Sequence, residues 1–155
     1  MNLAHLHLVL NHLPVLGTGF GLALLIFGLW RRSDELKKTA LGVLVLVALA
    51  AVPAYLTGEP AEELVEAVPG VSKPAMERHE RAASVSFTGV LVIGVAATAG
   101  LVVFRRGKAL PRWFAMPMVA SVLVVTGLMA WTANLGGQIH HTEIQGTSGS
   151  ETSRH

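Results

Sequence analysis

The sequence contains no cysteine, which excludes disulfides, thiolate haem ligation, iron–sulfur clusters and cysteine-based zinc sites. Charge is also scarce, since only 14% of the 155 residues are charged, against about 25% in a typical soluble domain. Hydrophobic residues make up 52% of the chain. The net charge of +2 arises from basic residues clustered beside apolar runs, a pattern that indicates membrane orientation and argues against a nucleic-acid partner. We therefore expect one domain embedded in a lipid bilayer.

Four stretches lack acidic and basic residues over 8–30, 39–58, 82–104 and 113–136, and each has at least the length of about 20 residues that crosses a hydrocarbon core of ~30 Å as a helix. A helix also satisfies its own backbone hydrogen bonds inside lipid. The chain is predicted to be all-α, with a four-helix transmembrane bundle over residues 1–145 and a polar, disordered tail over 146–155. The expected helices span about 8–30, 39–58, 74–106 and 113–136, with a short interfacial helix at 61–67.

The two short connections between these helices are strongly basic. Residues 31–38 and 105–112 each carry four Lys or Arg, whereas residues 59–81 carry six Glu against three Lys or Arg. The positive-inside rule places the basic connections in the cytoplasm and both termini outside, as in a multi-pass protein of the bacterial inner membrane. The basic side chains are expected to set orientation and not to take part in chemistry. The first eleven residues contain no Lys or Arg, so we expect the first apolar segment to be retained and not removed as a signal peptide.

With this orientation, six of the seven histidines belong to the outer face. They are His5, His7, His12, His79, His140 and His141. Imidazole is costly near lipid and readily ligates metals and haem. Three helices would present these side chains at similar depth, as in cofactor sites of helix bundles. Each histidine alone is explained by the amphipathic character of imidazole, but six at one face indicate a cofactor site.

Haem b is the cofactor that this pattern favours, because bis-imidazole ligation needs only two histidines on facing helices. The expected ligands are His12 together with His79 or His141. His7 is a further ligand or a neighbour that hydrogen-bonds to one. Arg78 and Arg81 lie at the same face, where they can hold haem propionates or pair with nearby glutamates.

The alternative cofactor is Cu or Zn. Residues 5–7 (His-Leu-His) and 140–141 (His-His) resemble fragments of such sites, although neither spacing is specific. The candidate metal ligands are the same four histidines, His12, His79, His141 and His7.

Small residues follow two of these histidines at helical spacing. Ala82, Ala83, Ser86 and Gly89 follow His79, and Gly17, Gly19 and Gly21 follow His12. Such strips leave room for a flat macrocycle, or they serve close helix packing, and the sequence leaves both readings open.

Three short motifs mark the two ends of the chain and the start of the expected third helix. Residues 7–14 (HLVLNHLP) place two histidines five positions apart, with a proline two positions after the second. Residues 133–144 (ANLGGQIHHTEI) contain a Gly-Gly pair and end in Ile-His-His-Thr-Glu-Ile, and residues 79–83 read HERAA. These motifs resemble those of a family of uncharacterised small four-helix bacterial membrane proteins.

The resemblance covers nearly the whole chain and implies the four-helix fold, but it implies no particular reaction. It favours His7, His12, His79 and His141 as the family-like set. His140 stands where the family has arginine and is a weaker candidate, and His5 is intermediate.

The leading hypothesis is an electron carrier similar to a b-type cytochrome, which exchanges electrons at the outer face with quinol or a periplasmic redox protein. A stand-alone enzyme is disfavoured, since no HExxH motif, Gly-rich phosphate loop or paired intramembrane carboxylates occur. The alternative is a non-haem metal-binding protein, or a structural small subunit that forms a homo-oligomer or joins a larger membrane complex.

Reporter fusions test the predicted orientation. A reporter inserted between residues 31 and 38 should be active only in the cytoplasm, and one fused after Gly146 only outside, because the basic connections resist translocation. The reverse pattern would remove the basis for grouping the six histidines at the outer face.

Overall fold

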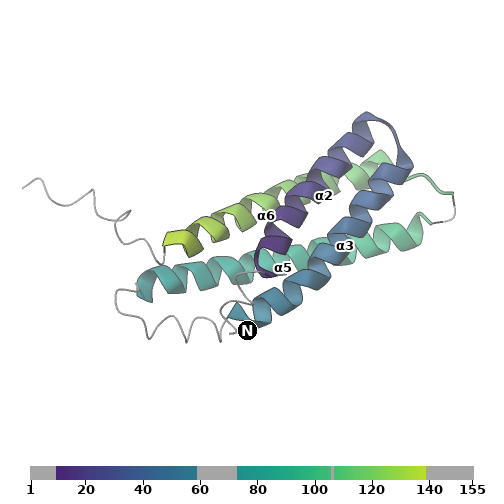
Figure 1. The fold of residues 1–155 in the computed structure, drawn as a ribbon. Helices are drawn as coiled ribbons and strands as arrows, with labels where there is room; N and C mark the ends of the chain where they lie inside the picture. Colours follow the sequence, from purple (N-terminus) through teal and green to yellow (C-terminus); the bar gives the residue numbers. More distant parts are fainter. Residues whose placement is uncertain (1–9, 59–72, 106, 139–155) are drawn as a thin grey trace, which may run out of the picture.

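A computed structural model of the chain describes residues 10–58, 73–105 and 107–138. These residues form four helices, α2 (His12–Trp30), α3 (Asp34–Leu56), α5 (Lys73–Val103) and α6 (Arg112–Gln138) (Figure 1). All four are long and apolar enough to cross a membrane, which confirms the predicted all-α transmembrane bundle. The predicted helix at 61–67 and the tail at 146–155 lie outside the described residues.

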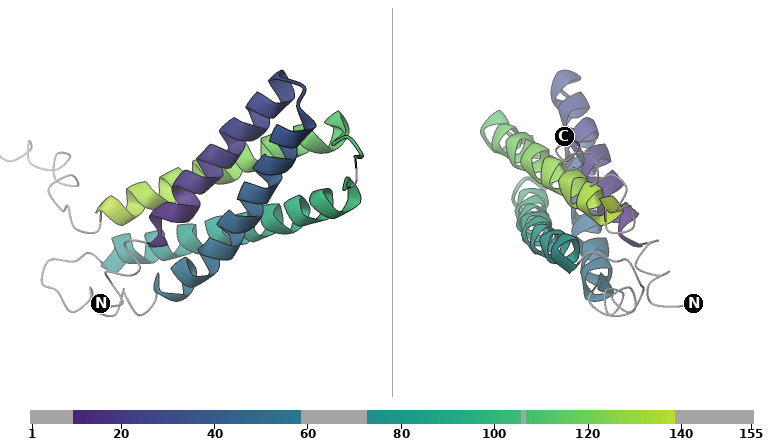
Figure 2. Two further views of the ribbon diagram at one scale, coloured as in Figure 1. Left: turned by 45° about the vertical axis from the view of Figure 1, so that its right-hand side comes forward. Right: turned by 90° about the vertical axis from the view of Figure 1, so that its left-hand side faces the viewer.

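The helices form a closed ring in which each packs against two neighbours. α2 packs against α3 and α6, and α5 packs against the same two helices. α2 and α5 therefore occupy diagonal corners of the bundle, as Figure 2 shows from two sides. The chain runs up and down, so the connections after α2 and after α5 lie at one end.

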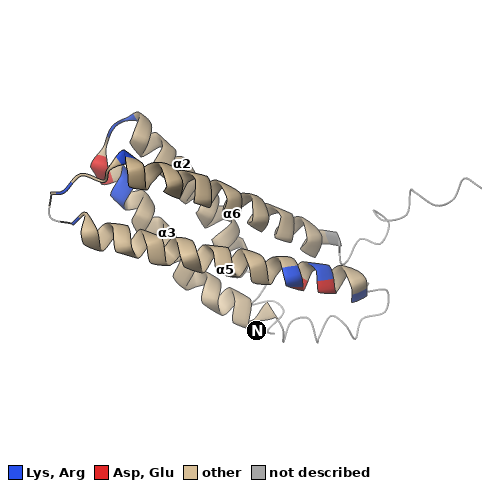
Figure 3. Cartoon of the chain, turned by 180° about the vertical axis from the view of Figure 1, so that it is seen from behind, with Lys and Arg blue, Asp and Glu red and all other residues tan. Residues whose placement is uncertain are grey.

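The two ends of the bundle differ in charge. Figure 3 shows Lys and Arg side by side in and beside the connections after α2 and α5, together with Asp34 and Glu35 in the first turn of α3, and a second group of charges on the first turns of α5. We call the first the basic end and the opposite one, where α2 and α5 begin, the histidine end. α5 and α6 extend past the start of α2 at the histidine end (Figure 1).

Helix α3 begins at Asp34, five residues before the expected start at 39. Ser33 has extended backbone, and its hydroxyl accepts a hydrogen bond from the Leu36 N–H at 3.3 Å. Asp34 and Glu35 occupy the first turn, where carboxylates interact favourably with the helix dipole. The expected boundary was wrong because an absence of charge marks where lipid begins, whereas capping residues mark where the helix begins.

The interior of the bundle is apolar and closely packed. Its largest fully buried apolar side chains are Leu25, Leu41, Leu44, Leu110, Val90 and Val122. Towards the histidine end, the ring of Tyr55 on α3 stacks on Phe87 of α5, with 4.2 Å between the ring centroids. The Tyr55 hydroxyl also shares a hydrogen bond with Ser84 Oγ at 3.0 Å. Aromatic and hydroxyl contacts thus join α3 to α5 at this level.

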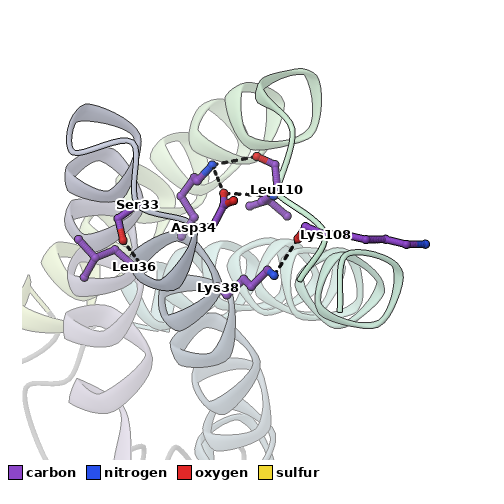
Figure 4. Close-up of polar contacts among 7 residues, drawn as sticks. Ser33, Asp34, Leu36, Lys38, Lys108 and Leu110 are labelled. Atoms are coloured by element: carbon purple, nitrogen blue, oxygen red, sulfur yellow. Dashed lines mark hydrogen bonds and ion pairs between the residues drawn. The ribbon is translucent and has the colours of Figure 1, made fainter. Parts of the chain in front are cut away.

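A group of polar contacts at the basic end joins the start of α3 to the connection between α5 and α6, and we call it the loop clasp (Figure 4). Lys37 is only 7% exposed. Its Nζ donates to the Leu110 carbonyl at 2.9 Å and forms an ion pair with Asp34. Asp34 Oδ1 accepts a hydrogen bond from the Leu110 N–H at 3.2 Å, and Lys38 Nζ donates to the Lys108 carbonyl at 2.8 Å. A buried ammonium is tolerated because each of these groups is paired.

Replacing Lys37 tests the buried part of the clasp. Lys37→Met should lower the free energy of unfolding by about 1–3 kcal/mol, because it leaves Asp34 and the Leu110 carbonyl without their buried partner. Thermal unfolding of purified protein in detergent measures the loss. Lys38→Met is the matched control: it removes the same charge from the same connection, but its hydrogen bond is exposed and worth less. Equal losses for the two variants would show that charge alone is responsible.

Candidate cofactor site

Two of the six histidines predicted to form a cofactor site lie within the described residues. His12 is the first residue of α2 and has an exposed side chain. His79 lies in the second turn of α5 and is half-buried. Both helices begin at the histidine end, as expected, although they stand at diagonal corners of the bundle. His5, His7, His140 and His141 lie outside the described residues.

The imidazole of His79 is oriented by a backbone carbonyl of α6. Its Nδ1 lies 3.0 Å from the carbonyl oxygen of Thr132. A carbonyl oxygen can only accept, so Nδ1 carries the hydrogen and donates it. In the neutral ring the lone pair then lies on Nε2. Histidines that ligate metals commonly show this arrangement, with one ring nitrogen donating to a carbonyl or carboxylate and the other binding the metal.

A second hydrogen bond joins α5 and α6, and its residue on α5 lies two turns after His79. The Thr132 hydroxyl donates to the Leu128 carbonyl at 2.9 Å and lies 2.9 Å from Ser86 Oγ, so Ser86 donates to Thr132. Ser86 is 1% exposed and Thr132 is 9% exposed. Paired hydroxyls of this kind hold neighbouring helices together in lipid, where an unpaired one would be costly. Through its contacts with Ser86 and His79, Thr132 thus fixes the register of α6 against α5.

Gly136 gives the imidazole its space. A Cβ atom built on Gly136 would lie 3.1 Å from His79 Cε1 and 3.3 Å from Nδ1, which is tighter than ordinary contact. A Cβ on the neighbouring Gly137 would meet no atom within 4 Å. The ring of His79 therefore occupies the volume of a side chain at position 136.

Sequence reasoning missed Thr132 and Gly136 as parts of this site. The Gly136–Gly137 pair was visible as a motif, but its role depends on the register of α6 against α5. The carbonyl of Thr132 left no signal, because every residue has one.

The strips of small residues serve close helix packing along the described helices. A Cβ on Gly89 would lie 2.8 Å from Val125 Cγ2 of α6. Cβ atoms on Gly17 and Gly21 would lie 2.5 Å from Val47 Cγ2 and 2.7 Å from Leu44 Cδ2 of α3. Of the two readings that the sequence left open, packing is the one observed at these glycines. A macrocycle bound to His79 therefore has to lie towards the end of the bundle and not along these strips.

The charged side chains near His79 are exposed. Arg81 Nη2 lies 3.7 Å from Glu77 Oε2, and Arg81 Nε donates to the Glu77 carbonyl at 3.3 Å, so this arginine pairs with a neighbouring glutamate. An exposed ion pair of this kind contributes little to stability, so Arg81 can bind another carboxylate in place of Glu77. Arg78 is exposed as well.

Met76 precedes His79 by three residues and is buried, so a thioether lies on the same helical face as the imidazole. Among residues 10–58, 73–105 and 107–138, no three His, Asp or Glu side chains come together as a metal site. His79 thus supplies an oriented imidazole at the histidine end.

Comparison of the chain with family models, curated proteins and solved structures finds no match, so the candidate function rests on the residues and geometry of the histidine end itself.

Proposed function

We propose that the protein is a membrane-embedded haem protein similar to a b-type cytochrome, with His79 as an axial ligand of haem b at the histidine end. The observation that carries this proposal is the hydrogen bond from His79 Nδ1 to the Thr132 carbonyl. It fixes the ring tautomer and orientation, so that Nε2 is the atom that would bind the iron. A bound haem would supply one-electron chemistry, and this chain would contribute the ligand and its surroundings.

The second axial ligand comes from the remaining predicted set. His141 and His7 are candidates beside His12, whose exposed side chain lies at the same end of the bundle. The exposed guanidinium groups of Arg78 and Arg81 are available to haem propionates at the membrane surface, because the pair with Glu77 is weak. With the basic end in the cytoplasm, the histidine end faces outward in the inner membrane, and the electron partners are quinol or a periplasmic redox protein.

Copper binding is the second candidate, and the position of Met76 favours it. Thioether sulfur is a soft ligand that selects Cu(I), and imidazole also suits copper. Met76 and His79 share one helical face at the histidine end. Elemental analysis of the purified protein separates this candidate from haem.

Replacing His79 tests the haem proposal. Wild-type protein produced with ample haem should show a Soret band and a sharp reduced α band in a reduced-minus-oxidised visible spectrum. His79→Ala should abolish or shift these bands, because it removes a coordinate bond to iron. Thr88→Ala is the matched control, since it removes a hydroxyl of α5 whose acceptor, the Ser84 carbonyl, lies on the same helix and not on α6. Wild-type protein without a Soret band contradicts the proposal, and copper or zinc in the same sample supports the alternative.

Two neighbouring glycines test the orientation of the ring. Gly136→Ala should displace the His79 imidazole by a few tenths of an ångström and shift the haem bands or the reduction potential, because the new methyl group meets Cε1 and Nδ1. Gly137→Ala is the matched control at the adjacent position, where the methyl group meets nothing. The readout is spectroelectrochemical titration of both variants. Identical titrations for the two variants and the wild type would show that His79 does not ligate the haem.

A further inference from the structure

A groove runs between α3 and α5 on the outside of the bundle. Its volume is about 600 Å³, within the range of roughly 300–1,000 Å³ typical of ligand pockets. Exposed side chains form its walls, including Leu49 on α3, which is 64% exposed, and Val95 on α5, which is 71% exposed. Thr98 is the one lining side chain with a polar atom, and its hydroxyl donates to the Gly94 carbonyl at 2.8 Å. The groove thus offers apolar surface to the surrounding lipid.

Small residues create the groove. Gly94 packs directly on Ala48, so the two backbones approach closely and no side chain fills the space above them. Ala99 continues the groove on α5 towards the basic end.

The length and position of the groove match one leaflet of a bilayer. On α5 it extends from Leu91 to Val103, a helical rise of about 18 Å. Half of a hydrocarbon core is about 15 Å thick. The groove ends at Val103, and the exposed Arg105 and Lys108 follow immediately at the basic end. Apolar surface for about the length of one leaflet therefore leads to positive charge at headgroup level.

The Lys108 ammonium points away from the other connection. The loop clasp uses only the backbone carbonyl of Lys108, which accepts from Lys38 Nζ at 2.8 Å. Figure 4 shows the side chain of Lys108 extending away from the clasp. The clasp thus holds the backbone in place and leaves this charge for another partner.

We propose that this groove binds an anionic phospholipid, with one acyl chain along α3 and α5 and the headgroup phosphate against Arg105 and Lys108. Basic residues beside a crevice between membrane helices recognise anionic headgroups in this way. A second copy of the chain fits less well. All copies share one orientation in the membrane, so a symmetric dimer through this groove would bring two sets of Arg105 and Lys108 together at the same depth, and like charges repel.

Native mass spectrometry of the full-length protein tests the proposal. The protein is released from detergent after titration with phosphatidylglycerol or with phosphatidylcholine carrying the same acyl chains. The wild type should bind one phosphatidylglycerol about tenfold more tightly than phosphatidylcholine, because two basic side chains face the anionic headgroup. The double variant Arg105→Gln, Lys108→Gln should lose this preference. Arg31→Gln, Arg32→Gln is the matched control, because it removes the same charge at the same end beside α2, which does not line the groove.

Filling the groove tests the acyl-chain contact. Ala99→Phe should weaken binding of both lipids at least about fivefold, and Val95→Phe serves the same purpose if the first variant does not fold. Ala120→Phe on the exposed face of α6 is the control and should bind as the wild type does. Equal affinity of the wild type for the two lipids overturns the proposal. The proposal is also overturned if Ala99→Phe and Ala120→Phe bind the lipids equally well. A dimer mass that is present in the wild type and absent in Ala99→Phe would overturn it as well, because it would identify a second copy of the chain as the occupant of the groove.

Discussion

The absence of water from the bilayer is the constraint on which the rest of this structure depends. Because no solvent can satisfy a polar group there, the backbone is helical and polar side chains within the bundle find partners close by. Thr18 shows the local solution, since its buried hydroxyl donates to the Pro14 carbonyl at 2.9 Å. In the part of the chain that the structure describes, every buried side-chain nitrogen and oxygen has a partner. Polar contacts between helices are therefore few, and each one fixes the position of two elements.

These contacts lie at both ends of the bundle, while small residues and aliphatic side chains pack the middle. The loop clasp joins the start of α3 to the connection between α5 and α6 at the basic end. At the histidine end, Ser86 and His79 bind two different atoms of Thr132. Because α6 is held at Thr132 by both contacts, the imidazole of His79 has a defined direction. That makes it a better ligand candidate than a surface histidine with free rotation.

Much of the fold could be predicted from the sequence, because lipid imposes a simple rule on it. The four uncharged stretches predicted the four helices, and the basic character of two connections predicted that these connections lie at the same end of the bundle. The start of α3 could not be found from the same rule, since Ser33 and Asp34 begin the helix in the charged connection outside the lipid. The burial of Lys37 was also missed, because a basic residue in a loop is ordinarily solvated.

The candidate site was predicted only in part. His79 could be singled out because imidazole is rare beside membrane helices. Its partner could not, because the Thr132 carbonyl depends on the register of α6 against α5, which the sequence of either helix alone does not contain. The small residues beside the histidines were compatible with two uses, and only the positions of Val125 and Leu44 on the neighbouring helices decided between them.

The burial of Lys37 also has a consequence for the order of assembly. Its acceptor, the Leu110 carbonyl, lies 73 residues later in the chain. At roughly 5–20 residues per second, the ribosome reaches that residue about 4–15 s after it has made Lys37. During this interval the ribosome completes the sequence of α3, and of the two partners of the Lys37 ammonium only Asp34 has been made. Lys37 therefore becomes a buried link at the basic end only when the second hairpin arrives.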